Sequence, residues 1–364
     1  MNSRLNIMYL LSSFNSGGSE RMITEFFEEA KKHNDINFIL VVMNDKFDEQ
    51  LKKQVENTGY KCIFLNRKES KLDIKYLFEL IKIVKENNIH IIHSHNYGSK
   101  FWSILCKMLM PKLKLFFTIH SITTFRGQIF LKILLHNLFI DENIAISESV
   151  KDVSEKYGIK RIKRIYNGID VKKYDIDNCT SEDFKIINVA RINHKIKGQD
   201  ILIKAVNECK RRGYNFKCDL VGGIYDYGLQ SYEYLKNLIE ELGLKENVNF
   251  LGNRDDVPNL LSQSDIFVSS SREEGFGLTI IEAMSAKIPV ISSDVFGPKE
   301  IIKDGTGLFF ESENFTDLAN KIIQLYLDKN LRENLVEKAY EYAKEFDMKN
   351  MYEKYLTEYE EITK

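Results

Sequence analysis

Two carboxylates flank a glycine-containing turn in the segment REEGFGLTIIEAM, residues 272–284. Glu274 and Glu282 stand eight residues apart, with Gly275, Phe276 and Gly277 between them. An apolar run precedes the turn and a helix-like stretch follows it, so the unpaired N–H groups of a helix start would favour a phosphate. Carboxylates accept hydrogen bonds from sugar hydroxyls but repel bare phosphate. The segment predicts a ligand with phosphate in the middle and a sugar at each end, or, alternatively, a plain turn followed by a solvated helix.

Two cations form a second group. Arg191 and Lys197 lie six residues apart in VARINHKIKGQD, across the end of an apolar strand and the start of the next helix. At that edge of a sheet they would neutralise a diphosphate, the guanidinium in bidentate fashion and the ammonium as a point charge. Each cation taken alone is equally compatible with an ordinary surface charge. Their predicted position at the same sheet edge as the glycine turn favours the ligand site.

The amino-terminal half contributes further candidates. Gly17 and Gly18 follow the first apolar run and would let a ligand approach the backbone closely. His120 closes the run KLFFTIH at the carboxyl end of a predicted strand, where it is a candidate for sugar contact or proton handling, or else a buried core histidine. His93 and His95 alternate onto one strand face, but the sequence offers no third metal ligand, so we expect no metal.

Several other chemistries lack their motifs. The sequence has no G-x-S-x-G elbow and no G-x-x-x-x-G-K-[ST] loop, which removes support for hydrolase and triphosphatase activity. GFGLTI begins like a dinucleotide fingerprint but ends in Ile280. Asp175 and Asp177 form a D-x-D pattern in a polar linker with no strand before it, so we interpret the pattern as coincidence.

The candidate residues must be positioned by alternating strands and helices. Apolar β-branched runs alternate with helical runs over most of the 364 residues, and a polar stretch near residues 163–184 interrupts them. This pattern predicts an α/β fold of two Rossmann-like, doubly wound parallel-sheet domains that face a cleft. We place the first domain at residues 1–178 plus 346–364, with a returning C-terminal helix, and the second at residues 179–345.

Composition indicates a globular protein of a reducing compartment. Hydrophobic residues make up 43% and charged residues 29%, and the five cysteines are odd in number and scattered. We expect the first apolar stretch to be a strand instead of a signal peptide, and the runs are too short for a membrane span. The expected location is the cytoplasm.

Charge is distributed unevenly. The sequence has no acidic residue between Glu86 and Asp141. The basic residues in that interval are Lys100, Lys107, Lys112, Lys114, Arg126 and Lys132. Apolar residues interleave with them, which suits an anionic membrane surface, although Phe116 and Phe117 are equally compatible with a buried strand. A nucleic-acid partner is not expected, because basic residues are not clustered elsewhere.

Taken together, these motifs resemble the retaining glycosyltransferases of family 4, which have the GT-B fold. The matching segments are EEGFGLTIIEA, RINHKIKG, NSGGSER and YNGID, and the resemblance is strongest over residues 188–310. It implies transfer of a sugar from a nucleoside-diphosphate sugar, expected to be a UDP-linked hexose or N-acetylhexosamine, to a glycan or lipid-linked acceptor. It also implies no cofactor and no bound metal. Alternatives are a nucleotide-sugar epimerase of the same fold and a non-catalytic partner subunit.

The resemblance implies roles for the second domain. Arg191 and Lys197 would bind the donor diphosphate and stabilise it as leaving group. Glu274 would hold hydroxyls of the transferred sugar, and Glu282 the nucleoside ribose. Retention would come from attack on the face that the phosphate leaves, with a phosphate oxygen taking the acceptor proton.

It also implies contacts around these residues. Backbone amides near Gly277 and Leu278 would meet the phosphates, and the loop at Asn253 and Arg254 would receive the base. His120 would contact the donor sugar from the opposite domain.

The glycine loop of the first domain, Gly17 and Gly18, would admit the phosphate and the acceptor. A lipid-linked acceptor would place the enzyme at the inner face of the plasma membrane as a peripheral protein.

Overall fold

The computed structural model describes residues 4–15, 17–33, 35–68, 73–177, 183–225 and 228–364. Two compact units divide the chain: unit 1 is Met1–Gly168 with Met348–Lys364, and unit 2 is Ile169–Asp347.

The observed boundaries differ from the predicted ones. The N–H of Ile169 donates to the carbonyl of Phe346, and the short helix η1 (Val171–Tyr174) packs against helices of unit 2, so unit 2 begins before residue 178. Residues 178–182 themselves lie outside the described residues. At the other end Phe346 packs edge-on against Phe276 at 5.8 Å between ring centroids, which keeps it in unit 2. The helix that returns to unit 1 therefore starts at Met348 instead of residue 346.

Unit 1 contains a parallel sheet of seven strands in the order β3-β2-β1-β4-β5-β6-β7. The strands are β1 (Leu5–Leu11), β2 (Ile36–Asn44), β3 (Lys61–Arg67), β4 (Ile91–Ser94), β5 (Lys114–Ile119), β6 (Glu142–Ala145) and β7 (Ile162–Arg164). The central strands are buried on both faces, as their continuous apolar runs predict. From β1 the chain continues through β2 to β3 at one edge of the sheet. It then returns to the centre with β4 and continues to β7 at the other edge, so the direction of strand addition reverses between β1 and β4.

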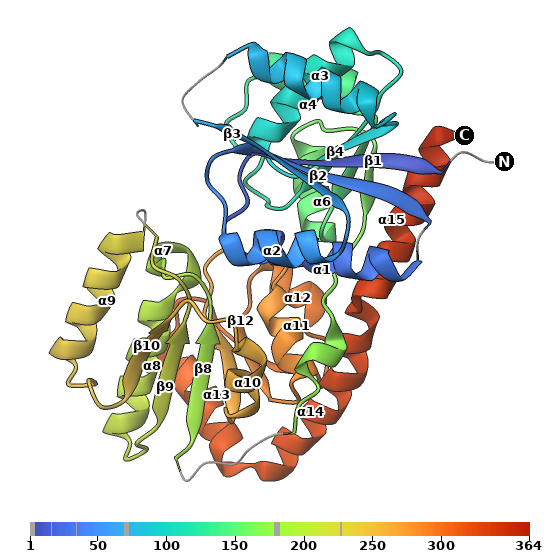
Figure 1. Ribbon diagram of the computed structural model, residues 1–364. Coiled ribbons are helices and arrows are strands. Elements are labelled where there is room, and N and C mark those ends of the chain that lie inside the picture. The colour runs from blue at the N-terminus through green and yellow to red at the C-terminus, as the bar shows by residue number, and fades with distance from the viewer. Residues whose placement is uncertain (1–3, 16, 34, 69–72, 178–182, 226–227) are drawn as a thin grey trace. The chain divides into compact units, whose positions relative to one another are not determined.

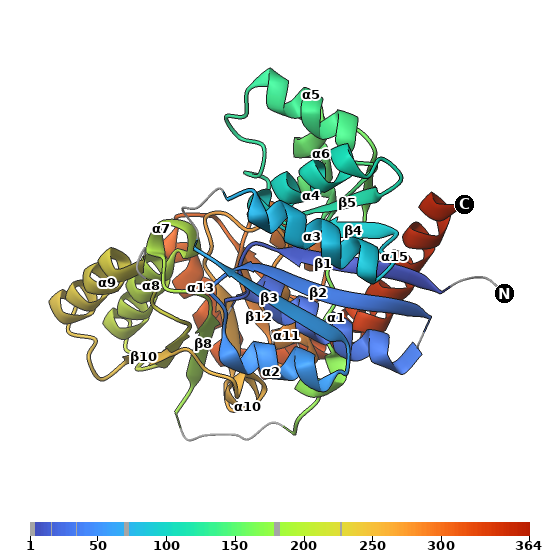
Figure 2. The same ribbon diagram turned by 45° about the horizontal axis from the view of Figure 1, so that its top comes forward.

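Helices cover both faces of this sheet. They are α1 (Gly18–His33), α2 (Glu49–Asn57), α3 (Lys75–Glu86), α4 (Tyr97–Leu109), α5 (Phe130–Phe139), α6 (Glu148–Lys156) and α15 (Met348–Thr363). Figures 1 and 2 show α1 and α2 on one face of the sheet and α3 and α4 on the other. The C-terminal helix α15 packs beside α1, with Tyr352, Tyr355 and Tyr359 in the core.

Unit 2 contains a parallel sheet of six strands in the order β10-β9-β8-β11-β12-β13. The strands are β8 (Lys185–Val189), β9 (Lys217–Val221), β10 (Val248–Gly252), β11 (Ile266–Ser269), β12 (Val290–Ser293) and β13 (Leu308–Phe310). The order reverses between β8 and β11. Ligands of open parallel sheets bind at such a switch point, beyond the carboxyl ends of the strands.

The helices of unit 2 are α7 (His194–Lys197), α8 (Gln199–Arg211), α9 (Leu229–Glu241), α10 (Val257–Ser262), α11 (Leu278–Ser285), α12 (Phe296–Ile301), α13 (Phe315–Leu327) and α14 (Lys329–Ala343), with η3 (Lys344–Phe346) after them. Helix α8 packs against α9 and α13, and α11 packs against α14 and η1. The two doubly wound parallel sheets confirm the fold class predicted from the sequence.

Candidate active site

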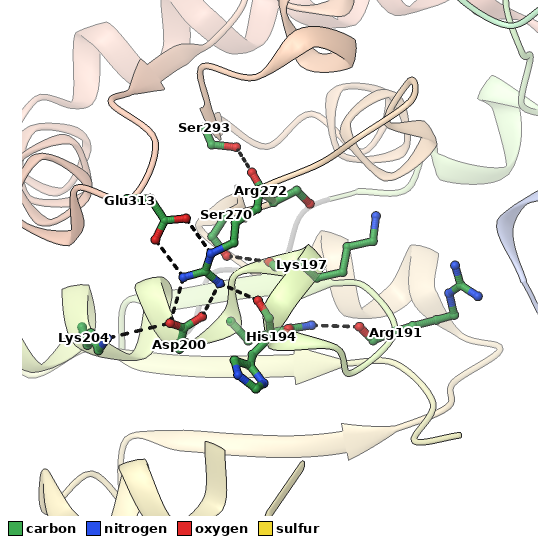
Figure 3. Close-up of polar contacts among 11 residues, drawn as sticks. Arg191, His194, Lys197, Asp200, Lys204, Ser270, Arg272, Ser293 and Glu313 are labelled. Carbon is green, nitrogen blue, oxygen red and sulfur yellow. Dashed lines mark hydrogen bonds and ion pairs between the residues drawn. The ribbon is translucent and has the colours of Figure 1, made fainter. Parts of the chain in front are cut away.

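The predicted residues of unit 2 gather at the switch point of its sheet. Arg191 lies just beyond the end of β8, Lys197 is the last residue of α7, and Glu274 lies in the loop that follows β11. Because β8 and β11 are neighbours in a parallel sheet, their carboxyl ends share one edge. Figure 3 shows the side chains of Arg191 and Lys197 extending to the same side.

Lys197 and Glu274 form an ion pair. The Lys197 ammonium donates to Glu274 Oε2 at 2.6 Å, and the two side chains are only 17% and 19% exposed. Ser271 Oγ lies 3.5 Å from the same carboxylate oxygen. A cation for phosphate and an acceptor for hydroxyls are thus held in direct contact, so a bound sugar phosphate would meet both groups at once.

Arg272 ties the two loops of the site together, a role that sequence reasoning missed. Its guanidinium donates to both carboxylate oxygens of Asp200 at 2.7 and 3.0 Å, to the carboxylate of Glu313 at 2.5 and 2.8 Å, and to the carbonyl of His194 at 2.5 Å. Figure 3 shows Arg272 between these partners. Asp200 and His194 flank Lys197 in sequence, whereas Arg272 is two residues before Glu274, so this arginine sets the spacing of the Lys197–Glu274 pair.

Arg272 and Asp200 keep each other in their charged forms. Burial of Asp200 favours its neutral form, but the hydrogen bonds and charge of Arg272 outweigh burial and hold the pKa of the Asp200 carboxyl below its usual value. The bonds to Asp200, followed by those to Glu313, raise the pKa of Arg272. Burial lowers the pKa of His194, which stacks on Tyr234 at 4.4 Å between ring centroids.

A glycine permits the close packing of α7 on the end of β11. Gly198 has φ +61°, and a Cβ there would lie 1.9 Å from the carbonyl oxygen of Ser270. The hydroxyl of Ser270 donates to the carbonyl of Lys197 at 3.2 Å, and the N–H of Arg272 donates to the carbonyl of Ile196 at 2.8 Å. The backbone that carries Lys197 is therefore fixed against the loop that carries Glu274.

The Gly-Phe-Gly turn lies where the sequence places it, before α11. Gly277 is the N-cap of α11 with φ +113°, and Gly275 and Leu278 are half-buried. The Phe276 side chain is buried against Phe346, so only its backbone remains for the donor contact predicted at this residue. The N–H of Gly297 donates to the carbonyl of Glu274 at 3.2 Å, which braces the turn from α12.

The residues predicted to contact the ribose and the base of the donor lie at the same edge of the sheet or beside it. Glu282 is half-buried in α11, one turn beyond its start. Asn253 and Arg254 lie in an exposed loop after β10, and the Arg254 guanidinium forms a two-point ion pair with Asp256 at 2.8 and 2.6 Å. A contact between the Arg254 guanidinium and the base would therefore leave that group bound to the base and to Asp256 at the same time. The roles of these residues stay predictions.

In unit 1, His120 lies just beyond β5 and is partly buried. Its Nε2 is 3.3 Å from Nδ1 of the buried His95, which follows β4. Burial lowers the pKa of His120 to about 4. Burial, together with the repulsion that a protonated His95 would meet from protonated His93 or His120, holds the pKa of His95 well below its usual value. Because burial disfavours the charged form of both rings, a ring N–H of one donates to the ring nitrogen of the other.

The side chain of His93 is buried and hydrogen-bonded in the core of unit 1. Its Nδ1 pairs with the hydroxyl of Tyr359 at 2.5 Å and its Nε2 with that of Thr118 at 2.7 Å, in the core beneath α15. Both ring nitrogens of His93 are thus engaged in hydrogen bonds within the core. Within the described ranges, His, Cys, Asp and Glu do not gather in threes as metal ligands. The Asp175 carboxylate instead pairs with Lys287 and accepts from the hydroxyl of Tyr340 at 2.8 Å.

The glycine loop of unit 1 leads into α1. Gly18 is the first residue of α1, and a Cβ on Gly17 would lie 2.6 Å from Oε2 of Glu20. Next to this loop, the Ser12 hydroxyl donates to Asn96 Oδ1 at 2.6 Å across the β1–β4 switch point. The predicted contacts of Gly17, Gly18 and His120 with a donor held by unit 2 stay predictions.

The basic and apolar stretch is only partly at the surface. The expected surface position is wrong for Lys100 and Trp102, whereas the burial of Phe116 is the alternative that the sequence left open. Lys100, Trp102 and Phe116 are buried, because α4 turns Lys100 and Trp102 inward and Phe116 lies in β5. The Lys100 ammonium lies 3.3 Å from Nδ1 of His136. The exposed apolar residues of this region lie instead on the outer side of α4 and on α5.

Comparison with known proteins agrees with this architecture. Residues 16–173 match the model named Glycosyltransferase Family 4, and residues 173–342 match the model named Glycosyl transferases group 1. An uncharacterized glycosyltransferase of Methanocaldococcus jannaschii is 30% identical over 75% of this chain and 77% of its own length. An N-acetyl-D-galactosaminyltransferase of Campylobacter jejuni, named for a PP-undecaprenol-linked glycan, is 24% identical over 97% of each chain.

Solved structures show the same fold. A glycosyltransferase from Rickettsia africae superposes with a TM-score of 0.86 at 25% identity, over 100% of this chain and 99% of the other. HepE of Anabaena, solved in complex with UDP and glucose, superposes with a TM-score of 0.83 at 21% identity, over 97% and 98% of the chains.

Two doubly wound parallel sheets, with cations and carboxylates at the switch point of the second, are the architecture of the GT-B fold. The chain belongs to the glycosyltransferases, within the family 4 group of that fold.

Proposed function

We propose that this glycosyltransferase is a retaining enzyme that uses a nucleoside-diphosphate sugar, a UDP-linked hexose or N-acetylhexosamine, as donor. The observation that carries the proposal is the contact of Lys197 with Glu274 at the β8–β11 switch point, beside Arg191. HepE, which binds UDP and glucose, shares the fold and supports a donor of this kind.

Arg191 and Lys197 would stabilise the diphosphate as it leaves. Charge develops on the leaving phosphate in the transition state, and fixed cations in a partly buried site stabilise it most. Two such cations also supply the charge that a divalent metal would otherwise provide, so no metal or other cofactor is proposed. The N–H groups at the start of α11, near Gly277 and Leu278, would bind the phosphates.

The carboxylates would select the sugars at the two ends of the donor. Glu274 would accept hydrogen bonds from hydroxyls of the transferred sugar, and its ion pair with Lys197 would orient it. Glu282 would accept from the ribose, and the loop at Asn253 and Arg254 would receive the base.

His120 suits hydrogen bonding to a donor-sugar hydroxyl better than proton transfer. A pKa of about 4 leaves its ring neutral at pH 7, and a general acid or base works best with a pKa near the working pH. The acceptor proton would pass to the departing phosphate oxygen on the same face of the sugar, which gives retention without a protein nucleophile.

Unit 1 would bind the acceptor, a glycan or a lipid-linked glycan. The Campylobacter jejuni relative, which spans nearly the whole chain, is named for a lipid-linked glycan and supports this choice. Among the described residues, the structure contains no helix that is both long and apolar enough to cross a membrane. We propose a cytoplasmic enzyme that works as a peripheral protein on an anionic membrane surface.

A donor screen tests the proposal. The purified protein is incubated with UDP-, GDP- and ADP-sugars, with and without a lipid-linked acceptor, and products are followed by mass spectrometry. Release of the nucleoside diphosphate with sugar on the acceptor supports a transferase. Conversion of the donor sugar without release would indicate an epimerase, and binding alone would indicate a non-catalytic subunit.

Two variants test the site itself. Lys197→Ala should lower kcat by about 100- to 1,000-fold, the usual cost of losing one stabiliser of transition-state charge. Lys195→Ala, an exposed lysine of the same short helix, is the matched control and should retain normal turnover. Equal activity of the two variants would show that the site is misassigned.

A further inference from the structure

Helix α5 presents an apolar face to the outside of unit 1. Phe130 is 81% exposed and Leu138 68% exposed, and Leu131, Leu134 and Leu135 are 57%, 51% and 43% exposed. We call these five residues the α5 face. Residues 130, 134 and 138 recur at helical spacing, with 131 and 135 beside them, so they form one continuous arc.

The opposite side of α5 is firmly attached to unit 1. Ile133 and His136 are buried there, and the ring of His136 accepts from the ammonium of Lys100 on α4 at 3.3 Å. His136 Nε2 in turn donates to Asn143 Oδ1 at 2.8 Å on β6. Arg161 donates to the carbonyl of Ile140 at 2.6 Å just beyond the helix end. The exposed arc therefore belongs to a helix whose orientation is set by its buried polar contacts.

Helix α4 exposes apolar side chains as well. On α4, the side chains of Phe101, Met108 and Leu109 are 44%, 57% and 58% exposed. Helices α4 and α5 meet through Lys100 and His136, and Figure 2 shows α5 at the outer end of unit 1. Five large apolar side chains exposed on one helix face mark an interaction site, because soluble proteins seldom expose so many large side chains together.

Charge identifies the partner. Lys132 is the sole charged residue of α5, and Arg126 before it and Lys160 after it are exposed. Two acidic side chains follow α5 closely: Asp141, which is paired with Lys107, and Glu142, which is partly buried at the start of β6. The α5 face also lies in a part of the sequence, residues 87–140, that contains basic residues and no acidic ones. An apolar arc with this charge matches an anionic bilayer, where Phe and Leu enter the acyl boundary and lysines meet the headgroups.

We propose that the α5 face is a membrane-docking surface that inserts into the headgroup region of an anionic lipid bilayer. The inference deepens the proposed function, since a transferase with a lipid-linked acceptor must work at a bilayer. The contact with the bilayer is assigned to α5 and not to the residues around Lys100, which are buried.

Vesicle binding tests the proposal without any donor or acceptor. The full chain is co-sedimented with vesicles of 70% phosphatidylcholine and 30% phosphatidylglycerol, and with pure phosphatidylcholine vesicles. We expect binding to the anionic vesicles at low salt, weaker binding at high salt, and at least tenfold weaker binding to the neutral ones. Absence of binding to the anionic vesicles at low salt would overturn the proposal.

Matched variants locate the surface. Leu134→Ser with Leu138→Ser should reduce vesicle binding at least tenfold, with an unchanged melting temperature. Leu229→Ser with Leu327→Ser removes two leucines of unit 2 that are 54% and 65% exposed and should bind like the wild type. Equal binding by both double variants would overturn the assignment, as would a concentration-dependent dimer that the α5 variant abolishes.

Turnover with donor and a soluble acceptor separates this inference from the proposed function. The α5 variant should turn over normally in that assay. A wild type that binds vesicles but transfers no sugar would contradict the proposed function and leave the docking surface intact.

Discussion

Replacement of Arg272 by methionine tests the idea that this residue positions the candidate active site. Methionine retains much of the side-chain length but loses every bond to Asp200, Glu313 and the carbonyl of His194. Asp200 would then be left with Lys204 at 3.8 Å as its remaining ion-pair partner among the described residues.

The magnitude follows from burial. The Asp200 side chain is 6% exposed and that of Arg272 is 24% exposed, whereas the side chain of Glu313 is 58% exposed. Removal of one partner of a buried pair costs about 3 to 5 kcal/mol, and an exposed pair contributes about 0 to 1 kcal/mol. Because Arg272 is partly solvated and Lys204 remains, we expect a loss of about 2 to 4 kcal/mol. For a domain of this size that corresponds to a fall of roughly 5 to 15 °C in Tm.

Calorimetry of the full chain and steady-state kinetics measure the two effects. Arg272→Met should lower the Tm and reduce kcat about tenfold or more, since small misplacement of catalytic groups is costly. Arg272→Met with Asp200→Leu should recover much of the Tm, because no buried charge is left unpaired. Turnover should stay low in this double variant, since the bond to His194 is still absent.

Arg211→Met is the matched control, since that side chain is 72% exposed and pairs with Glu208 on one helix. It should change the Tm and kcat little. A wild-type kcat for Arg272→Met, at a reduced Tm, would show that Arg272 stabilises unit 2 without positioning the site. An unchanged Tm would refute the energetic reasoning itself.

The remaining predictions concern three other positions. Burial lowers the pKa of Lys100 to about 7, so between about pH 7 and 10 the unfolded chain binds more protons and stability should rise with pH. Denaturation curves of the wild type and Lys100→Met should diverge over that window by up to about 4 kcal/mol, and parallel curves would contradict the assignment. A Cβ on Gly297 would lie 2.7 Å from the carbonyl oxygen of Glu274 and the nitrogen of Phe276, so Gly297→Ala should shift the turn and raise the KM for donor about tenfold or more. Unchanged donor kinetics would show that the turn tolerates the methyl group. Glu282→Ala should mainly raise the KM for donor in a nucleoside-diphosphate release assay, and a loss confined to kcat would assign it a different role.

Several features of the site follow from local sequence. Apolar runs with glycine turns after them predict parallel strands and the edge at which they end. That edge is shared by neighbouring strands, so Arg191, Lys197 and Glu274 were expected near one another, and the contact of Lys197 with Glu274 agrees with this. The positions of Gly277 and Glu282 relative to α11 follow from the same reasoning.

Other features depend on partners far away in the chain. Arg272 and Asp200 are 72 residues apart, and nothing in the local spacing of either predicts the pair. The unit boundary likewise depends on the packing of Phe346 against Phe276. Neither contact has a local sequence signal, because each joins two segments that only the fold brings together.

Helices α4 and α5 show most clearly where sequence reasoning ends. Both contain mixed apolar and basic residues, and periodicity alone does not say which side faces the sheet. In the structure the polar Lys100 and His136 face inward, where they satisfy each other, while Phe130 and Leu138 face outward.

By itself, the sequence determined the strands, the helices and the sheet edge where the charged residues meet, because these depend on short-range periodicity and turn chemistry. The tertiary structure decided which charges pair and which helix faces are covered. Burial and ion pairing depend on neighbours brought close by the fold, and those neighbours are distant in the chain.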